Sequence, residues 1–220
     1  MEKRSIILGG YNTAADGLWT LTAWAFSEPT YEQNFVKVPG SSVTLDLSGA
    51  LTDGEPCFDA RTLSATFESS EGTRLERKVR LDEMVNRLHG RRMDIVLPDD
   101  PDRYITGRVS VLVQYNDNAH ASVIVEAICD PWRYDAEETI VYFEGTDTEQ
   151  VQMLTNYGRK PVVPTILVEG GEITLTFEES TITLAEGTHI TPMLYLTTGE
   201  HELTYKGTGS ALLTWREAAL

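Results

Sequence analysis

The stretch YITGRVSVLVQYNDNAHASVIVEAIC, residues 104–129, holds two runs rich in Val and Ile on either side of a polar segment. Such runs are typical of β-strands. The segment Asn116–Asn118 between them has the residue types that turns favour. The stretch therefore predicts a long β-hairpin, with one strand over Tyr104–Gln114 and the other over Ala121–Cys129.

Upstream of this hairpin the chain holds short strand-like runs separated by Gly, Asn, Asp and Pro. Val43, Leu45 and Leu47 alternate with polar residues, a pattern that predicts a strand with one buried face. The four predicted strands are Ser5–Leu8, Leu18–Phe26, Val43–Leu47 and a run reaching from Leu63 to Phe67. A further strand is expected at Met93–Leu97, followed by the turn PDDPD at 98–102.

The hydrophobic period changes once, between residues 81 and 88. Apolar residues fall there at i, i+3, i+4 and i+7, which predicts a helix with one buried side: Leu81, Met84, Val85 and Leu88. Gly90 is a natural helix stop. Leu75 and Val79 lie about 100 degrees or more off that stripe at the helical rotation per residue, so the start of the helix is not fixed by the pattern.

A domain boundary is expected near Tyr134, which divides the chain into residues 1–134 and 135–220. Pro131 follows Asp130 and is expected to end the hairpin's second strand, because proline lacks the N–H that a sheet ladder needs. Arg133–Glu138 is polar enough to be a linker. Charge also differs across this point: residues 1–134 carry 14 basic and 20 acidic side chains, net −6, and residues 135–220 carry 4 and 14, net −10.

The second part consists of short alternating runs, spaced about 8 to 12 residues apart, which is typical of a β-sandwich or barrel. They are Thr139–Phe143, Val162–Val168, Glu172–Phe177, Thr181–Leu184, Met193–Leu196, Glu202–Tyr205 and Ala211–Trp215. The first run has two possible locations, in the sheet of the first domain or in that of the second.

Composition argues against several classes of protein. The net charge of −16 should repel nucleic acid and anionic membranes. The apolar run Ile6–Leu8 is too short for a signal-peptide core, and no stretch approaches the roughly 20 residues of a membrane span. A chain of 220 residues needs no disulfide framework, so Cys57 and Cys129 are expected to be unpaired and buried.

No constellation for catalysis or metal binding stands out, and we expect no enzyme activity, cofactor or metal. The sequence lacks a G-x-S-x-G elbow, a P-loop and an H-E-x-x-H motif. Asp99, Asp100 and Asp102 lack the pattern of a calcium loop, which favours a solvated turn. The four histidines, His89, His120, His189 and His201, have no zinc-like spacing.

Aromatic residues leave two interpretations open. Trp19, Trp24 and Trp132 could stack on sugars, but core or subunit-interface anchors are the commoner role of such side chains. A lectin-like site in the second domain would need a tryptophan beside several polar groups, and only Trp215 is available there.

A series of motifs in order along the chain resembles the distal tail protein family of long-tailed bacteriophages. In the first part these are Pro39-Gly40, Asp46-Leu47-Ser48, Arg61, Leu88-His89-Gly90, Asp99–Asp102 before Tyr104, Gly107-Arg108 and Cys129-Asp130-Pro131. The second part is similar to the galectin-like sandwich of that family, through Asn156, Gly158, Pro164, Gly199, Tyr205 and Gly207. The series covers nearly the whole chain.

The resemblance implies a mostly β protein, with a ring-forming β-sandwich domain that has one α-helix and a long β-hairpin, followed by a galectin-like β-sandwich. It implies a virion structural protein of a phage or prophage, assembled in the bacterial host cytoplasm and placed at the tail tip. It further implies a hexameric ring that joins the tail-tube protein to tip, baseplate or receptor-binding proteins, and through which DNA passes.

Five residues are candidates for structural or interface roles: Tyr104, Gly107, Arg108, Asp130 and Pro131. Gly107 permits close approach of neighbouring backbone or marks a bulge. Arg108 is a candidate partner for a carboxylate, in the acidic turn or on a neighbouring subunit, with a solvated arginine as the alternative. Two other functions stay open: a carbohydrate-binding module of two β domains for attachment to the host surface, and an accessory domain of a cell-wall hydrolase.

Overall fold

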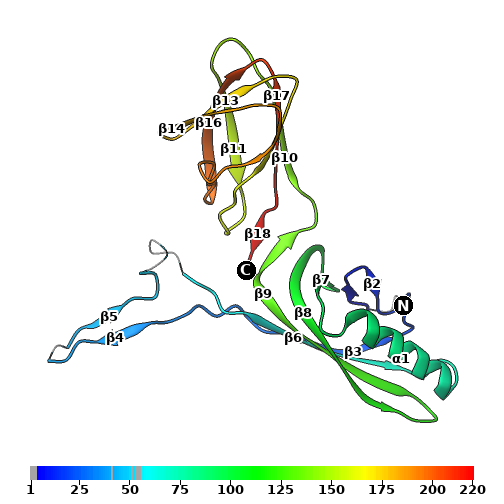
Figure 1. Ribbon diagram of the computed structural model, residues 1–220. Helices are drawn as coiled ribbons and strands as arrows, with labels where there is room; N and C mark the ends of the chain where they lie inside the picture. The colour runs from blue at the N-terminus through cyan, green and yellow to red at the C-terminus, as the bar shows by residue number, and fades with distance from the viewer. Residues whose placement is uncertain (1–3, 41, 51, 53–55) are drawn as a thin grey trace. The chain divides into compact units, whose positions relative to one another are not determined.

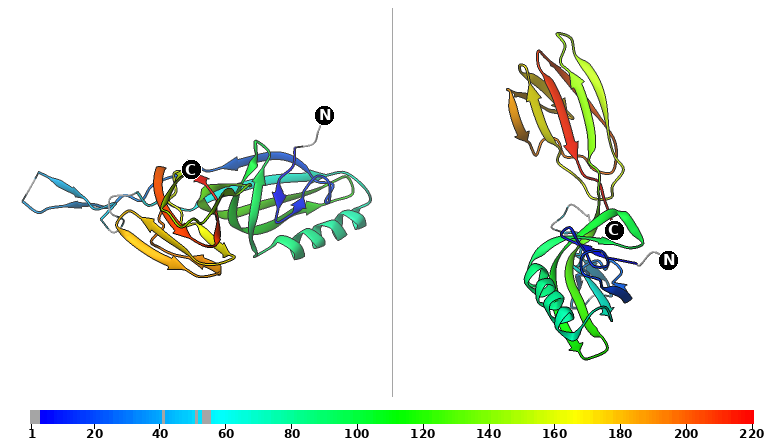
Figure 2. Two further views of the ribbon diagram at one scale, coloured as in Figure 1. Left: turned by 90° about the horizontal axis from the view of Figure 1, so that it is seen from above. Right: turned by 90° about the vertical axis from the view of Figure 1, so that its right-hand side faces the viewer.

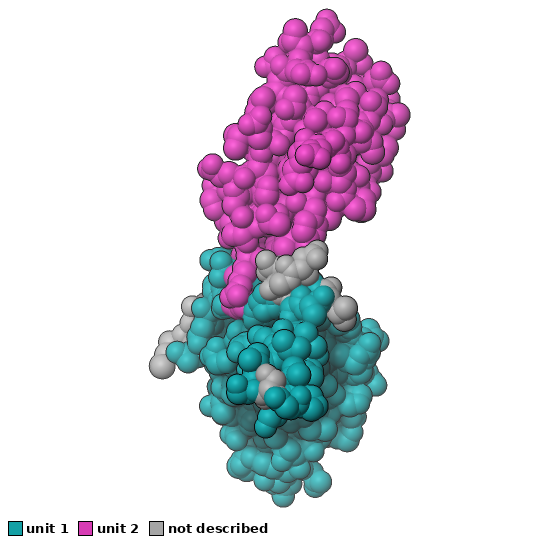
Figure 3. Space-filling model, turned by 90° about the vertical axis from the view of Figure 1, so that its left-hand side faces the viewer, with its two compact units in different colours: residues 1–133 teal, residues 134–220 magenta. Residues whose placement is uncertain are grey.

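A computed structural model of the chain describes residues 4–40, 42–50, 52 and 56–220. The chain divides into two compact units, residues 1–133 and 134–220, which Figure 3 colours separately. The two units have separate hydrophobic cores with no residue in common. Strands dominate, and the described ranges contain one α-helix and no helix that is long and apolar enough to span a membrane.

The first unit is built on one large antiparallel sheet, in which seven of its strands follow the order β2-β1-β7-β8-β9-β6-β3 (Figure 1). The elements are β1 (Ile7–Leu8), β2 (Tyr11–Asn12), β3 (Thr20–Phe26), β4 (Phe35–Lys37), β5 (Thr44–Asp46), β6 (Arg61–Ser69), α1 (Arg74–Leu88), β7 (Arg92–Leu97), β8 (Asp100–Asn116) and β9 (Ala121–Asp135). β8 and β9 are the predicted hairpin, longer at both outer ends than the sequence indicated.

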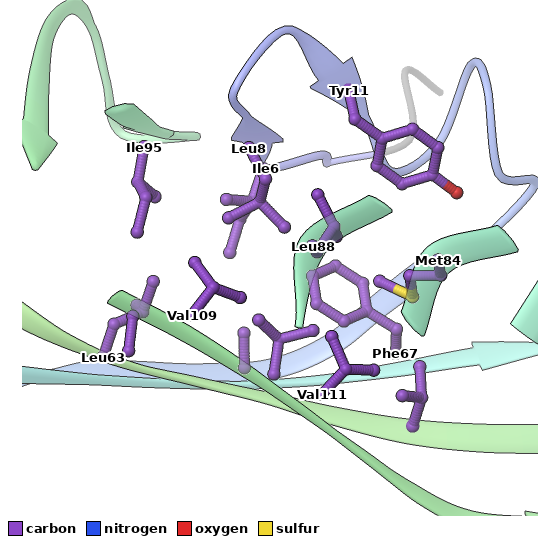
Figure 4. Packing of buried hydrophobic residues seen from close by; sticks show 14 of the residues in the cluster. Ile6, Leu8, Tyr11, Leu63, Phe67, Met84, Leu88, Ile95, Val109 and Val111 are labelled. Atoms are coloured by element: carbon purple, nitrogen blue, oxygen red, sulfur yellow. The ribbon is translucent and has the colours of Figure 1, made fainter. Parts of the chain in front are cut away.

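One face of this sheet is covered, and alternation along the strands explains why. In β6 every second residue from Arg61 to Ser69 is buried, as the period-2 geometry of a half-covered strand requires. Figure 4 shows Val109 and Val111 of β8 among the same cluster as Met84 and Leu88 of α1. The helix stripe predicted from the sequence therefore packs on the sheet, together with Ile6, Leu8 and Tyr11 from the N-terminal segment.

The helix begins and ends at residues with clear capping chemistry. Thr73 is the N-cap: its hydroxyl accepts a hydrogen bond from the Glu76 N–H, and the Glu76 carboxylate accepts from the Thr73 N–H in return. Leu88 is the last helical residue, and Gly90 has a φ of 76°, a conformation that costs glycine little. The capping box fixes the start that the apolar pattern left open.

Two boundaries predicted around the hairpin were wrong. The acidic turn is shorter than expected, because β8 already begins at Asp100 and leaves only Pro98 and Asp99 between β7 and β8. Pro131 does not end the second strand, since β9 continues to Asp135. The pairing of β9 with β6 ends at the pair Arg61 and Cys129, so Pro131 lies beyond that ladder and its missing N–H removes no bond from it.

β4 and β5 form a separate two-stranded ribbon, which Figure 1 shows extending from the sheet of this unit. β4 was not predicted. Val43, Leu45 and Leu47 were expected to lie on a half-buried strand, but all three side chains are exposed, at 59%, 47% and 40%. No described residue of the first unit covers these three side chains, although their alternation predicts that one face of the strand is buried.

The second unit is a sandwich of two four-stranded antiparallel sheets, ordered β10-β17-β12-β15 and β11-β16-β13-β14. Its strands are β10 (Thr139–Glu144), β11 (Gln150–Asn156), β12 (Thr165–Glu169), β13 (Ile173–Phe177), β14 (Ser180–Leu184), β15 (Gly187–Ile190), β16 (Gly199–Gly207), β17 (Ser210–Trp215) and the short β18 (Ala218–Ala219). Both sheets contribute to one core, for example Ile166 and Leu213 from the first and Leu175 and Leu203 from the second.

The pairing of β10 with β17 places the run that had two possible locations in the second unit. Three strands of this unit, β11, β15 and β18, were not predicted. Gln, Thr and His interrupt the alternation of the first two, and β18 has only two residues. The predicted strand Met193–Leu196 is instead an irregular segment that Leu196 anchors through a single bridge to Val162.

Candidate assembly surfaces

The face of the β8–β9 hairpin that points away from the core carries apolar side chains as well as charges. Odd-numbered residues from Ile105 to Val111 are buried, so even-numbered residues occupy the other face. On that face Leu112 is 42% exposed and Ile128 is 67% exposed. Glu126 and Arg108 are also exposed there. Apolar and charged side chains therefore share this exposed face of the hairpin.

Gly107 lies within β8, opposite β9. A Cβ atom at this position would lie 2.6 Å from Cys129 Sγ and 3.1 Å from the Ile128 carbonyl oxygen. Of the two roles predicted for this glycine, close approach of backbone is the one that the packing supports. Gly107 thus permits β8 and β9 to pack closely where the buried Cys129 side chain fills the space.

Arg108 contacts a group other than the acidic turn, which was one of the partners predicted for it. Arg108 Nη1 donates to the Gly90 carbonyl oxygen at 2.6 Å, at the end of the helix. The carboxylate of Asp100, in the predicted acidic turn, instead pairs with Arg133 at 3.3 Å. Asp130 forms an ion pair with Arg92 of β7. Arg108 thus ties the helix end to the sheet through a carbonyl, and the acidic turn is not its partner.

The remaining two candidates occupy the outer ends of the same hairpin. Tyr104 is half-buried in β8, and Pro131 is half-buried in β9. All five candidate residues therefore lie on the two longest strands of the first unit. The structure does not bring these five residues together in a pocket. What they share is their location on two neighbouring strands.

Arg77 is a structurally important residue that the sequence analysis did not single out. Its side chain is only 1% exposed, and its guanidinium donates to the carbonyl oxygens of Gly72 at 2.5 Å and Asp117 at 2.9 Å. The first contact is at the helix start and the second is at the hairpin turn. Arg77 precedes Leu81 by four residues and therefore lies on the same side of the helix. This spacing could have indicated from the sequence that Arg77 is buried.

A groove of about 540 Å³ lies between α1 and β8. Its apolar lining comes from Leu75, Leu81 and Val113, and its polar lining from Arg74, Lys78, Asp82 and Asn116. Leu75 is 73% exposed, and Val79 and Val113 are about half-exposed. The helix therefore presents a second apolar face, made by the two residues that did not fit the buried stripe.

The tryptophans do not form a platform for sugars. Trp19 and Trp215 are buried in the cores of the two units, and Trp24 packs against the first core. Trp132 contacts Phe58 edge to face, with ring centroids 5.5 Å apart. Trp19 and Trp24 thus have the core role that the sequence analysis favoured for them. Across the described residues, no group of three or more His, Cys, Asp or Glu side chains has the geometry to hold a metal ion.

Both cysteines are free thiols, as predicted, but their environments differ. Cys129 is buried, and burial together with the neighbouring carboxylate of Asp130 raises the pKa of its thiol to about 11. Cys57 is only half-buried, which corrects the expectation that both thiols are buried. It lies at the base of the β4–β5 ribbon, where its carbonyl oxygen accepts from the Glu32 N–H.

The fold of the whole chain is similar to that of a phage hub protein, although no family model and no curated protein matches the sequence. One solved structure with this fold is that of the SPP1 Dit protein (gp 19.1), described as a paradigm of hub adsorption apparatus in phages that infect Gram-positive bacteria. The superposition has a TM-score of 0.73 and covers 100% of both chains at 15% sequence identity. At this identity the similarity establishes the fold.

Proposed function

We propose that this chain is a structural hub protein of a phage tail tip. The observation that carries the proposal is the match in fold over the full length of both chains with the SPP1 Dit protein. A match that covers both units is stronger support than a match to one common β-sandwich, because sandwiches host many unrelated functions. The ordered motifs of the sequence support the same assignment independently.

The proposed form of the hub is a closed ring of six copies, contacting one another through the first unit. Edge strands of a sheet are normally covered or paired, and β3 pairs only with β6 among the described residues. The exposed apolar side chains on the outer face of the β8–β9 hairpin also favour contact with a neighbour. A head-to-tail contact repeated around an axis closes into a ring when the rotation permits.

The ring would surround the path of the DNA, and its partners would be the tail-tube protein on one side and tip or baseplate proteins on the other. A channel for DNA should be acidic or neutral, because a basic wall would hold phosphates. The net charge of −6 on residues 1–134 is compatible with such a channel. We place the protein at the tail tip of the virion after assembly in the host cytoplasm, and we propose no enzymatic role and no cofactor.

The mass of the purified chain in solution tests the ring. Light scattering after size exclusion should give about six times the mass of one chain, and negative-stain images should show rings with a central hole. Purified tail-tube protein from the same phage should bind these rings. A chain that stays monomeric at every concentration and salt tested, with no rings in images, would contradict the proposal.

The alternative of a carbohydrate-binding module receives less support from the structure, because the tryptophans are buried or packed against other side chains. Binding of a monomer to host-wall glycans, without any other phage protein, would favour it over the hub.

A further inference from the structure

One outer face of the second unit is apolar where alternation would make it polar. In the sheet β10-β17-β12-β15, Phe143, Leu213 and Ile166 belong to the core, so their neighbours along each strand point outward. The outward side chains of the four strands are Ile140, Tyr142, Leu167, Leu212 and Ile190, with Thr165, Thr188 and Thr214. Figure 2 shows this sheet in its right-hand view, with the red β17 between β10 and β12.

Cross-strand pairing places these apolar side chains next to one another, in what we call the apolar band. Tyr142 and Leu167 are both opposite Leu212, so the three form one row across β10, β17 and β12. In the next row Ile140 and Ile190 occupy the two edge strands, with a threonine on each strand between them. Ile140 is 60% exposed, Tyr142 56% and Ile190 70%. Neither row contains a charged residue.

A third row at one end of the same face is acidic. Glu144 and Glu169 are both opposite Ser210, two residues along their strands from the apolar band. Side chains two residues apart on a strand share a face, so both carboxylates project from the side that carries the band. Glu186 directly precedes β15 at the same end of the sheet. All three glutamates are exposed.

The second unit does not neutralise this acidic end. In the described ranges, no ion pair joins Glu144, Glu169 or Glu186 to a basic side chain. The Glu144 carboxylate accepts a hydrogen bond from the Tyr142 hydroxyl at 3.1 Å, which joins the acidic end to the band. Residues 135–220 hold 4 basic side chains against 14 acidic ones. Like charges that lie close together on a sheet are destabilising, and cations from outside this unit would relieve that cost.

The other sheet of the same unit provides an internal comparison. The outward side chains of β16, β13 and β14 are threonine, glutamate and lysine. The exposed apolar residues Val151 and Met153 lie together on one strand, β11. The apolar band is therefore a property of one face, not of the composition of the unit. An exposed apolar patch with polar residues at its rim is typical of a surface that binds protein, and tyrosine is enriched in such surfaces.

We propose that the outer face of the β10-β17-β12-β15 sheet docks a different protein, whose contact surface has an apolar centre and lysine or arginine side chains opposite the acidic end. A second copy of this unit is a poor occupant, because residues 135–220 have a net charge of −10 and supply few cations. Nucleic acid and anionic lipid are excluded for the same electrostatic reason. The inference deepens the proposed hub and rests on it for the choice of partner, a tip or baseplate protein of the same phage.

Titration of the full-length chain with purified tip and baseplate proteins of the same phage, one at a time, tests the apolar band. Tyr142→Ser combined with Ile190→Ser should weaken binding of the partner at least tenfold. The matched control is Val151→Ser combined with Met153→Ser, two side chains that are 57% and 48% exposed on the other sheet. The control should change binding by less than twofold. Because all four side chains are exposed, the melting temperature should stay close to that of the unmodified chain.

A second pair of variants tests the acidic end. Glu144→Gln combined with Glu169→Gln should weaken binding about fivefold at low salt, and the loss should shrink at high salt, where ions screen the attraction. Glu200→Gln combined with Glu202→Gln changes the net charge equally on the other sheet, so it separates a local contact from the effect of overall charge. This control should change binding by less than twofold. Equal losses for the two pairs would overturn the role of the acidic end.

Failure of the docking is distinguishable from failure of the hub. If the unmodified chain forms rings but binds no tip or baseplate protein, or binds one that neither target pair weakens, the docking is wrong while the hub proposal stands. If the target pairs abolish ring assembly instead, the face joins copies of this chain, and the docking of a different protein is wrong. A chain that neither forms rings nor binds any tail protein would contradict the hub proposal and the docking together.

Discussion

At the scale of single residues, the close approach of Gly107 to Cys129 constrains what β8 can hold at that position. Gly107→Ala should destabilise the first unit by about 1–3 kcal/mol, the usual cost of overpacking a dense core. The added methyl group would lie 2.6 Å from Cys129 Sγ and 3.1 Å from backbone oxygen of Ile128, which cannot move without shifting β9. Urea denaturation followed by circular dichroism of the helix measures the change.

A second substitution identifies the source of that strain. Cys129→Ala removes the sulfur atom, so it should recover part of the loss when it is combined with Gly107→Ala. The contact with the Ile128 carbonyl would remain, and recovery should therefore be incomplete. If the losses in the free energy of unfolding are strictly additive in the double variant, the added methyl group does not clash with the sulfur atom.

The two thiols should differ strongly in reactivity. A thiol with a pKa of about 11 is ionised only in about one molecule in a thousand at pH 8, and only the thiolate reacts. Cys129 is also buried, whereas Cys57 is half-buried. An Ellman assay of the native protein should detect one fast thiol, and Cys57→Ser should abolish it. Two fast thiols in the native protein would contradict the burial of Cys129.

At the scale of secondary-structure elements, Arg77 joins the helix to the hairpin turn. Arg77→Met should cost about 2–3 kcal/mol, because the carbonyl oxygens of Gly72 and Asp117 lose a charged donor in a buried place. Lys78→Met is the control, since its ion pair with Asp82 is exposed and contributes little. Equal losses for the two variants in urea denaturation would argue against this role of Arg77.

The capping box makes part of the helix stability depend on pH. Hydrogen bonds from Thr73 lower the pKa of the Glu76 carboxyl below its usual value. The unfolded chain therefore binds the proton more readily, and the stabilisation is present above about pH 4.3, the pKa of an unperturbed glutamate, and is lost as the pH falls through the lowered value. Wild type should be more stable than Glu76→Gln at pH 7, and the difference should shrink at pH 3. A difference that grows on acidification would contradict the assignment.

The elements that the sequence predicted well are those whose burial is decided within one unit. The stripe of Leu81, Met84 and Leu88 and the alternation of β6 reflect a single covered face, which periodicity reports directly. The end of β9 was missed because proline was treated as a stop, although it lies beyond the β6 ladder. Arg77 was missed because a charged residue is discounted on an apolar stripe, and only the structure supplies the two carbonyl groups that it binds.

The candidate surfaces were less predictable, for a physical reason. The guanidinium of Arg108 is suited to bind a carboxylate. It donates instead to the Gly90 carbonyl oxygen after the end of α1, and no sequence pattern specifies that contact. Val43, Leu45 and Leu47 alternate like a half-buried strand, yet burial of that face requires a surface that the described residues of the first unit do not provide. Patterning reports which face will be covered, and it carries no information on which molecule covers it.

At the scale of the whole molecule, the chain combines two cores of different construction. The first core lies between one face of a sheet and a helix with an N-terminal segment, which leaves the other face of the hairpin available for contacts. The second lies between two sheets and encloses Trp215. Because the two cores share no residue, each unit can fold as a body of its own.

This separation predicts that residues 1–134 fold and assemble without the rest of the chain. Every residue of the first core lies at or before Cys129, and every residue of the second lies at or after Phe143, so cutting after Tyr134 removes no member of the first core. The β3 edge and the β8–β9 hairpin both remain in the fragment. It should unfold in a single transition, keep the helix signal in circular dichroism, and form particles with the same number of copies as the full-length chain by light scattering. Residues 135–220 should be monomeric under the same conditions, because neither surface proposed for contacts between copies lies within them. A fragment 1–134 that is insoluble, or that is folded but strictly monomeric while the full-length chain forms rings, would show that the second unit contributes to the fold of the first or to the ring contacts.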